Sequence, residues 1–287
     1  MRVSIIGAKG QLGSDLCTIL SSSDIVPLTH SDIEITDINS VIEALTKCKP
    51  DVVINTAAYV RVDDCEINQD KAFLVNALGA RNVAVVAQEL GSKLVHISTD
   101  AVFGNELQTH TVPYTEFDNA SPINVYGKSK LAGEELVRHL CCRHFVVRTS
   151  GLFGLTGSSG KGGNFIESIL SIASNQEELK VVNDQVLSPT YAKDLANKIA
   201  QLITTEYYGI YHITNRSYCS WYEFACEIIK QAGLKLSIIP ISSDQYPQKA
   251  KRSSFSVLDN YHLRLLGMDD IRPWQEALAD YIREKTF

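Results

Sequence analysis

The feature that most constrains the fold is a glycine turn at the start of the chain. Val3 to Ile6 form a short apolar run, which predicts a buried strand, and Gly7, Gly10 and Gly13 follow it directly. A helical pattern begins inside the same turn, at Leu12. Such glycines allow a tight turn and a close approach of the backbone to a pyrophosphate, while amide groups at the helix N-terminus face the phosphates. The G-x-x-G-x-x-G spacing differs from the general G-x-G-x-x-G fingerprint, so an ordinary turn between a strand and a helix stays open beside dinucleotide binding.

The second predicted strand, Ile25 to Leu28, should end beside the adenosine ribose of such a dinucleotide. An acidic side chain at that point would accept hydrogen bonds from the ribose and repel a 2′-phosphate. Here Asp32 comes late and His30 is an ambiguous phosphate partner, so the sequence leaves both NAD(H) and NADP(H) open as the cofactor. Asp37 precedes a further helical pattern, and it is either the N-cap of that helix or a partner of the adenine amino group.

Two further strand ends carry small or polar residues. The predicted strand from Asp51 to Asn55 is followed by Thr56-Ala57-Ala58-Tyr59, and the one from Lys93 to Ile97 by Ser98-Thr99-Asp100. Small residues let a flat ligand lie against the backbone, in the crevice where open α/β sheets bind ligands. A turn that ends the strand would explain Ser-Thr-Asp by itself. Three such strand ends together favour a binding site.

A tyrosine and a lysine supply the candidate chemistry. Tyr126 and Lys130 lie four residues apart in a stretch rich in helix formers, after the helix-start signal Pro122, so they should share one helix face. An ammonium group beside a phenol stabilises the phenolate and lowers its pKa from about 10 toward the range of general acid/base catalysis. Taken alone, this spacing more commonly marks a solvated surface pair. The polar strand ends favour a pair that passes a proton to or from a substrate oxygen.

Charge and cysteine content exclude several classes of function. The formal net charge of −6 gives no basic field for nucleic acid or an anionic membrane surface, so neither is expected as a partner. The seven cysteines are odd in number and form no C-x-x-C motif, so we expect free thiols in a reducing cytoplasm. The first apolar run is too short for a secretory signal, and no run approaches the ~20 residues of a membrane span. We interpret His139 to His144 as the join of a helix and a strand rather than as a metal site.

The rest of the chain predicts an α/β fold, a Rossmann-type doubly wound parallel sheet with a smaller C-terminal α/β substrate-binding region. We expect residues 1–150 to form the dinucleotide-binding domain, 186–214 to return to it, and 151–185 and 215–287 to form the substrate-binding region. The glycine- and serine-rich segment 154–163 is typical of a mobile flap or a crossing between the two regions. Further helices are expected at 70–90, which carries Asn76 among apolar residues, and at 165–173, 189–203, 221–232 and 273–282.

Taken together, these motifs resemble in order and spacing those of the extended short-chain dehydrogenase/reductase superfamily, and within it the dTDP-4-dehydrorhamnose reductase family. The resemblance runs from Met1 to about Thr190, with a looser match from Ala250 to Leu258. The matching motifs not yet described are Val62-Asp63-x-x-Glu66, Arg148-Thr-Ser150, Gly163-Asn164-Phe165 and Asn183-Asp-Gln185-x-x-x-Pro189-Thr190.

The resemblance implies that NAD(P)H reduces the C4 keto group of a nucleotide-linked 4-keto-6-deoxy sugar. Tyr126 would protonate the keto oxygen, Lys130 would hold the nicotinamide ribose and tune Tyr126, and Thr99 would hydrogen-bond the keto group. Cofactor contacts are implied for Gly7, Gly10, Gln11, Leu12, Gly13, His30, Asp37, Ile38, Ala57, Ala58, Tyr59, Asn76, Tyr126 and Lys130. Substrate contacts are implied for Thr99, Asp100, Asn164, Gln185 and Arg252, without a metal. The expected partner is the nucleotide sugar, and the expected assembly is a monomer or a homodimer.

Departures from the family pattern bear on the substrate. Ala101 and Gly151 stand where the family usually has aromatic residues, which predicts a roomier sugar pocket. The lack of a second acid after Asp100 favours simple reduction over the water elimination of the related 4,6-dehydratases. Two alternatives stay open. One is a cofactor-binding regulatory subunit without turnover, like the reductase-like subunit of methionine adenosyltransferase, and the other is a reductase or epimerase of another nucleotide sugar.

Overall fold

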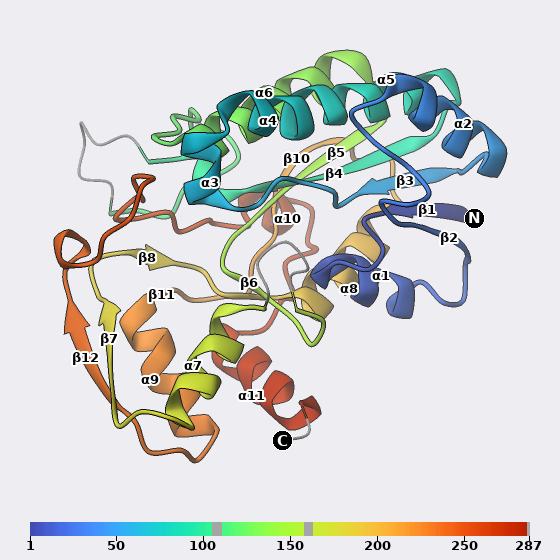
Figure 1. The fold of residues 1–287 in the computed structure, drawn as a ribbon. Coiled ribbons are helices and arrows are strands. Elements are labelled where there is room, and N and C mark those ends of the chain that lie inside the picture. The colour runs from blue at the N-terminus through green and yellow to red at the C-terminus, as the bar shows by residue number, and fades with distance from the viewer. Residues whose placement is uncertain (105–110, 158–162, 286–287) are drawn as a thin grey trace.

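The structure, a computed structural model, describes residues 1–104, 111–157 and 163–285. Its centre is a parallel six-stranded sheet in the order β10-β5-β4-β3-β1-β2 (Figure 1). The strands are β1 (Arg2–Ile6), β2 (Asp24–Leu28), β3 (Val52–Asn55), β4 (Lys93–Thr99), β5 (His144–Thr149) and β10 (Gly209–His212). The order reverses between β1 and β3, and open α/β sheets bind ligands beyond the carboxyl ends of their strands at such a switch point. The predicted fold class is confirmed.

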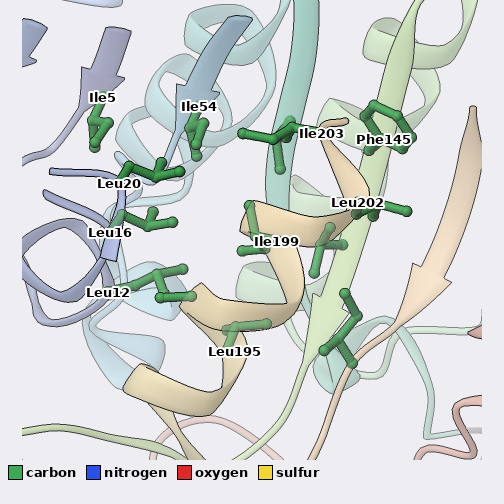
Figure 2. Packing of buried hydrophobic residues seen from close by; sticks show 14 of the residues in the cluster. Ile5, Leu12, Leu16, Leu20, Ile54, Phe145, Leu195, Ile199, Leu202 and Ile203 are labelled. Atoms are coloured by element: carbon green, nitrogen blue, oxygen red, sulfur yellow. The ribbon is translucent and has the colours of Figure 1, made fainter. Parts of the chain in front are cut away.

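Helices cover both faces of the sheet, as its mainly apolar strands, buried on both faces, require. On one face lie α1 (Gln11–Ile19) and α8 (Ala192–Leu202), whose leucines and isoleucines pack against Ile5 and Phe145 of the sheet (Figure 2). The other face is covered by α2 (Ile38–Cys48), α5 (Ala80–Glu89) and α6 (Val125–Leu140). Each face therefore has its own buried core, and α6, with the tyrosine and lysine pair, is fixed to the sheet.

The C-terminal region is a smaller α/β unit beyond the carboxyl edge of the sheet (Figure 1). Strands β7 (Glu178–Val182) and β12 (Ser237–Ile241) pair in parallel. Two short ladders join β6 (Leu152–Phe153) to β9 (Thr190–Tyr191) and β8 (Val186–Leu187) to β11 (Cys219–Ser220). Helices α7 (Phe165–Ala173), α9 (Trp221–Gln231) and α11 (Trp274–Glu284) share one core, in which Trp274 is buried.

The remaining short elements lie around these two units. They are α3 (Val62–Ile67), α4 (Gln69–Phe73), η1 (Leu74–Gly79), η2 (Asp100–Val102), η3 (Ser243–Gln245) and α10 (Tyr261–Leu265). No helix in the described ranges has the length and apolarity that a membrane crossing requires.

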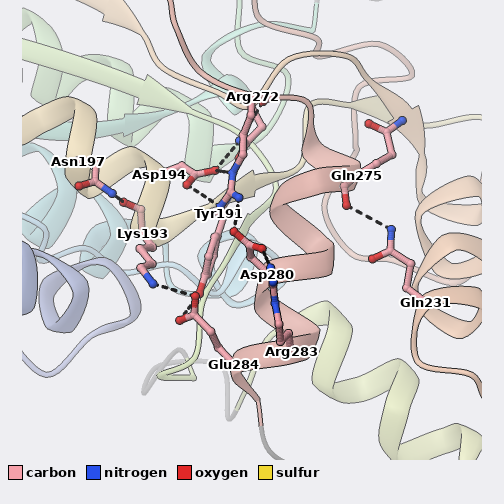
Figure 3. A network of polar contacts seen from close by, with 11 residues as sticks. Tyr191, Lys193, Asp194, Asn197, Gln231, Arg272, Gln275, Asp280, Arg283 and Glu284 are labelled. Atoms are coloured by element: carbon pink, nitrogen blue, oxygen red, sulfur yellow. Dashed lines mark hydrogen bonds and ion pairs between the residues drawn. The ribbon is translucent and has the colours of Figure 1, made fainter.

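A polar network ties the sheet to the C-terminal region through α8 and α11 (Figure 3). The guanidinium group of Arg272 donates to both carboxylate oxygens of Asp194 on α8, at 2.8 and 2.9 Å, and also pairs with Asp280 on α11. Lys193 on α8 pairs with Glu284 on α11 at 2.7 Å. The two units are therefore joined by ion pairs as well as by the chain.

Two of the three helix starts predicted at prolines are wrong, whereas Pro273 is the N-cap of α11. Helix α6 begins at Val125 rather than at Pro122, because the side chain of Asn124 caps it by accepting the Gly127 N–H at 2.8 Å. The helix predicted from Pro189 begins only at Ala192, since the two residues before it form β9.

One further prediction differs from the structure, and another concerns a segment that is only partly described. The helix predicted at 70–90 is not one regular helix, because the π-helix η1 separates α4 from α5. Half of the glycine- and serine-rich segment 154–163, residues 158–162, lies outside the described residues.

Candidate active site

A cleft of about 970 Å³ lies between the carboxyl edge of the sheet and the C-terminal region. Its walls come from the turn after β1, the ends of β2 to β5, the first turns of α6 and several C-terminal segments. Fourteen of the residues predicted from the sequence line it, namely Gly7, Gly10, Gln11, Leu12, His30, Ala57, Ala58, Thr99, Asp100, Tyr126, Lys130, Asn164, Gln185 and Arg252. The cleft thus lies at the switch point of the sheet, where a ligand is expected.

The glycine turn forms one end of the cleft. Gly7 has a φ of +81°, in the left-handed region, and a Cβ at this position would lie 2.5 Å from Oγ1 of Thr56. Only glycine fits such a place without strain. Next to it, Nε2 of Gln11 is buried and has no hydrogen-bond partner among the described residues. A buried amide without a partner is costly, so this donor suits a ligand that brings an acceptor.

Tyr126 lies in the first turn of α6, close to Thr99 at the end of β4. Burial raises the pKa of the Tyr126 phenol well above its usual range, and a hydrogen bond with Thr99 lowers that pKa only in part. Lys130 is not among the groups that shift this pKa. The prediction that Lys130 lowers it is therefore wrong, because the amine is turned toward the sheet, where it donates to the Ile97 carbonyl.

Lys130 is only 1% exposed, and its Nζ donates to the Ile97 carbonyl at 2.7 Å. The same Nζ lies 3.3 Å from Nε2 of His96. Burial lowers the pKa of Lys130 to about 8, and the carboxylate of Glu134 opposes that shift. The ammonium form of this lysine therefore still predominates at pH 7, but the group titrates far closer to neutral pH than an ordinary lysine.

Asp100 holds three hydroxyl groups around one buried carboxyl group. It accepts hydrogen bonds from Ser256 at 2.6 Å, Ser150 at 2.7 Å and Thr99 at 3.1 Å. Burial raises the pKa of this carboxyl group, and the three hydroxyl donors offset that effect in part. Asp100 lines the cleft, and it also joins the ends of β4 and β5 to the segment of the C-terminal region that carries Ser256.

Five predicted cofactor residues lie outside the cleft lining. Asn76 instead bonds to both backbone groups of Tyr59, at 2.8 and 3.2 Å, and so fixes the loop after β3. Asp37 is the N-cap of α2, where its carboxylate accepts the Asn39 N–H, and Ile38 packs against the core of that face. Gly13 lies against the turn itself, since a Cβ there would be 2.2 Å from the Gly7 carbonyl oxygen.

The three remaining candidates for substrate contacts come from the C-terminal region. Asn164 caps α7, and its amide also donates to the Gly154 carbonyl at 2.9 Å. Gln185 donates to Oγ of Ser243 at 2.8 Å. Arg252 pairs with Asp63 on α3 at 3.2 Å, with a quarter of its side chain exposed. All three line the cleft, and Arg252 brings a cation to it.

Comparison with known proteins identifies the family. The whole chain, residues 1–287, matches the model of the RmlD substrate binding domain. The chain belongs to this family. It is 40% identical over 289 residues to the spore coat polysaccharide biosynthesis protein SpsK of Bacillus subtilis (strain 168), covering 99% of this chain and 98% of that protein. It is 36% identical to the dTDP-4-dehydrorhamnose reductase of Aggregatibacter actinomycetemcomitans, covering 97% of each.

A solved structure agrees. The crystal structure of dTDP-4-dehydrorhamnose reductase from Bacillus anthracis str. Ames in complex with NADP is 41% identical in sequence, and it matches this fold with a TM-score of 0.94 over 99% of each chain. The resemblance stated from the motifs is therefore confirmed, over the entire chain rather than only to about Thr190.

In this member of the RmlD family, the sequence did not reveal the buried polar side chains that lie beneath the cleft. Arg148 on β5 pairs with Glu134 on α6 at 2.7 Å, and Ser98 on β4 also donates to Glu134. The ring of His212 on β10 lies 3.4 Å from Arg148. His96 had a visible signal, because an ionisable residue stood inside an otherwise apolar strand pattern. The other contacts depend on which strands are neighbours, and no local pattern encodes that.

Proposed function

We propose that the protein is a reductase that uses NADPH or NADH to reduce the C4 keto group of a nucleotide-linked 4-keto-6-deoxy sugar. One observation carries the proposal. Thr99, Tyr126 and Lys130 meet the glycine turn in one cleft, in a chain 36% identical along nearly its whole length to a dTDP-4-dehydrorhamnose reductase. Two hydroxyl groups and an amine beside a dinucleotide-binding turn match what carbonyl reduction needs from a protein.

The residues of the cleft fit a nicotinamide dinucleotide. The turn at Gly7 and Gly10 leaves room for a pyrophosphate, and the unpaired Nε2 of Gln11 is a donor that such a group can use. Ala57 and Ala58 provide a flat wall, and Lys130 is the candidate to hold the nicotinamide ribose. When bound, the dinucleotide supplies the hydride. A 41% identical relative was crystallised with NADP, which supports the same class of cofactor here.

Tyr126 is the proton donor in this proposal. Because burial raises its pKa, the phenol keeps its proton at neutral pH and can give it to the keto oxygen of the substrate. The Thr99 hydroxyl stabilises negative charge that develops on the same oxygen. Lys130 stabilises the resulting tyrosinate only in its ammonium form, and for that its Nζ, which donates to the Ile97 carbonyl, has to turn toward the phenol.

Arg252 and Gln185 are the candidate contacts to the diphosphate of the nucleotide sugar, and Asn164 shapes that wall through its cap on α7. Ala101 and Gly151 line the cleft beside Thr99 and support the roomier sugar pocket. We place the enzyme in the cytoplasm, which its seven free cysteines support. Light scattering of the purified chain would distinguish a monomer from a homodimer.

The proposal is tested by following oxidation of NADPH and of NADH with dTDP-4-keto-6-deoxy-mannose. We expect turnover by the native chain and a loss of kcat of roughly 100-fold or more in Tyr126→Phe, which removes only the proton donor. Tyr246→Phe is the matched control, because that tyrosine is 50% exposed and lies outside the cleft lining. Undiminished activity in Tyr126→Phe would contradict the assignment. Cofactor binding without turnover across a panel of keto sugars would favour the regulatory subunit.

A further inference from the structure

A chain of buried polar groups runs beneath Lys130, from one strand of the sheet to the next. Asn55 and His96 are register partners on β3 and β4, and Nδ2 of Asn55 lies 3.5 Å from Nδ1 of His96. On the other side of the ring, Nε2 lies 3.3 Å from Nζ of Lys130. All three side chains are about 1% exposed, so water does not replace these contacts.

The orientation of the Asn55 amide decides the tautomer of the histidine. Oδ1 of Asn55 accepts the Ala57 N–H at 3.1 Å, which leaves the NH₂ group to face His96. An NH₂ group can only donate, so Nδ1 of His96 has to accept. A neutral imidazole then carries its single proton on Nε2. The ring is neutral, because complete burial, the largest cause, holds the pKa of His96 well below its usual range whether or not Lys130 carries a charge.

The Nε2–H group therefore points at Nζ of Lys130. An ammonium group has no lone pair, so only the neutral amine can accept this hydrogen bond. The amine can still donate to the Ile97 carbonyl, which lies 2.7 Å from Nζ. The hydrogen bonds around Lys130 thus favour its uncharged form, in the same direction as burial, which lowers its pKa to about 8.

Few other ionisable groups act on the pair. Glu134, one turn further along α6, opposes the lowering of the Lys130 pKa, and its own charge is shared with Arg148 of β5 at 2.7 Å. Tyr126 on α6 is uncharged, because burial raises its pKa. Strand β3 faces the ring with Asn55, which does not titrate. The position of the proton on His96 therefore decides whether Lys130 faces a hydrogen-bond donor or an acceptor.

We infer that His96, through an Nε2–H bond to Nζ of Lys130, is a positioning residue that favours the neutral amine of this lysine and so lowers the pH at which the lysine loses its proton. The inference extends the proposed function, and its effect on the pH dependence of activity rests on that function. If the ammonium form stabilises the tyrosinate of Tyr126, activity falls as Lys130 loses its proton. His96 would then set the pH at which the reductase loses activity on the basic side.

The first test does not depend on activity. Nitrogen-15 NMR of the full-length protein without ligands, at pH 7, reports which ring nitrogen of each histidine carries the proton. We expect His96 as the neutral Nε2–H tautomer, assigned by its absence in His96→Gln, or by sequential assignment of the native chain if that variant does not fold. A proton on Nδ1, or a doubly protonated ring, overturns the inference.

The second test reverses the tautomer. Asn55→Asp keeps the side-chain shape and the acceptor for the Ala57 N–H, but it places a second acceptor opposite Nδ1 of His96. The ring should then carry its proton on Nδ1. Its Nε2 becomes an acceptor for the Lys130 ammonium group. We expect the basic limb of the pH–rate profile to move up by about one pH unit or more. The matched control is Asn82→Asp, a buried asparagine whose amide bonds to Ile35 and Arg81 instead.

A folded Asn55→Asp protein with the Nδ1–H tautomer and an unmoved basic limb would overturn the link between His96 and Lys130. If the native chain lacks reductase activity altogether, the proposed function fails, while the NMR result still decides the tautomer. The two failures are therefore distinguishable.

Discussion

At the scale of single residues, the buried carboxyl group of Asp100 is the clearest case of a side chain with several partners. Its three hydroxyl donors come from β4, from the end of β5 and from the C-terminal region. Hydrogen bonds to a buried carboxylate are stronger than neutral ones, and they lose their value when the acceptor is replaced. Asp100 therefore holds the wall of the cleft in place.

Replacing Asp100 by asparagine tests this role. The amide brings an N–H group into a place where three donors already converge, so we expect the free energy of unfolding to fall by about 1–3 kcal/mol. Urea denaturation measures the loss. Ser150→Ala and Ser256→Ala each remove one donor and should cost less than Asp100→Asn; equal losses in all three variants would contradict the central position of Asp100.

The buried pair of Glu134 and Arg148 supports a second prediction. Both side chains are at most 4% exposed, and Arg148 donates to Glu134 through Nε and Nη2. Glu134→Gln leaves the arginine charge unpaired, which should cost about 3–5 kcal/mol of unfolding free energy. In the double variant with Arg148→Met the unpaired charge is gone, so denaturation should show a smaller loss than the sum of the two single losses.

The sequence could predict the residues that line the cleft better than the residues that support them. Thr99, Tyr126 and Lys130 follow from local spacing at a strand end and on a helix. The contacts of Glu134 with Arg148, and of Asp100 with Ser256, join positions far apart in the chain, and they exist only because β4 and β5 are neighbours and the C-terminal region folds back over them. No local pattern carries that information.

At the scale of elements, α6 depends on one close approach. A Cβ at Gly127 would lie 2.1 Å from the Ala101 carbonyl oxygen in η2, so the helix can touch this backbone only through a glycine. Gly127→Ala would push the first turn of α6, with the neighbouring Tyr126, away from Thr99.

We expect Gly127→Ala to lower kcat/KM of the proposed reductase by roughly 100-fold, because small displacements at a reacting centre are costly. The activity assay measures it, with circular dichroism to check folding. Ala132→Gly, on the same helix and without such a contact, should lose only about 1 kcal/mol of stability and keep its activity. Full activity in Gly127→Ala would show that this approach does not position Tyr126.

The strands and most helices were predictable because apolar periodicity and burial coincide in them. The failures lie at helix starts, where proline was taken as the signal. At α6 the side chain of Asn124 decides the start, and at α8 a short ladder with β6 uses the residues before it. Long-range pairing therefore overrode the local signal at Pro189.

At the scale of the whole molecule, the junction of α1, α8 and α11 predicts how stability changes with pH. Burial raises the pKa of Asp15 on α1 to about 6, while Lys193 on α8 lowers it and Glu284 on α11 raises it. The unfolded chain loses this proton near 3.8, so the folded state binds more protons between about pH 4 and 6. Asp15 therefore costs stability as pH rises through this window, and the cost is complete above about pH 6.

Asp15→Asn should remove that cost. We expect the free energy of unfolding at pH 7.5 to rise by about 1 kcal/mol, a discounted figure because the side chain is partly solvated, and to rise less at pH 5. Urea midpoints at both pH values measure the difference. Asp32→Asn is the control: hydrogen bonds from Thr29 lower the pKa of Asp32, so this carboxylate is ionised in both states at both pH values, and the change in stability should be the same at pH 5 and pH 7.5. A gain that is equal at both pH values would exclude Asp15 titration as its cause.

The position of β10 in the sheet has a consequence for how this protein can be divided. After its first segment in the C-terminal region, the chain returns to the sheet. There α8, together with α1, covers one face, and β10 completes the sheet beside β5. A gene fragment that stops after residue 150 would encode a sheet with one face covered by α1 alone and with β5 as an open edge, the kind of surface on which chains aggregate. The sheet therefore cannot be completed until the chain has been synthesised at least as far as His212.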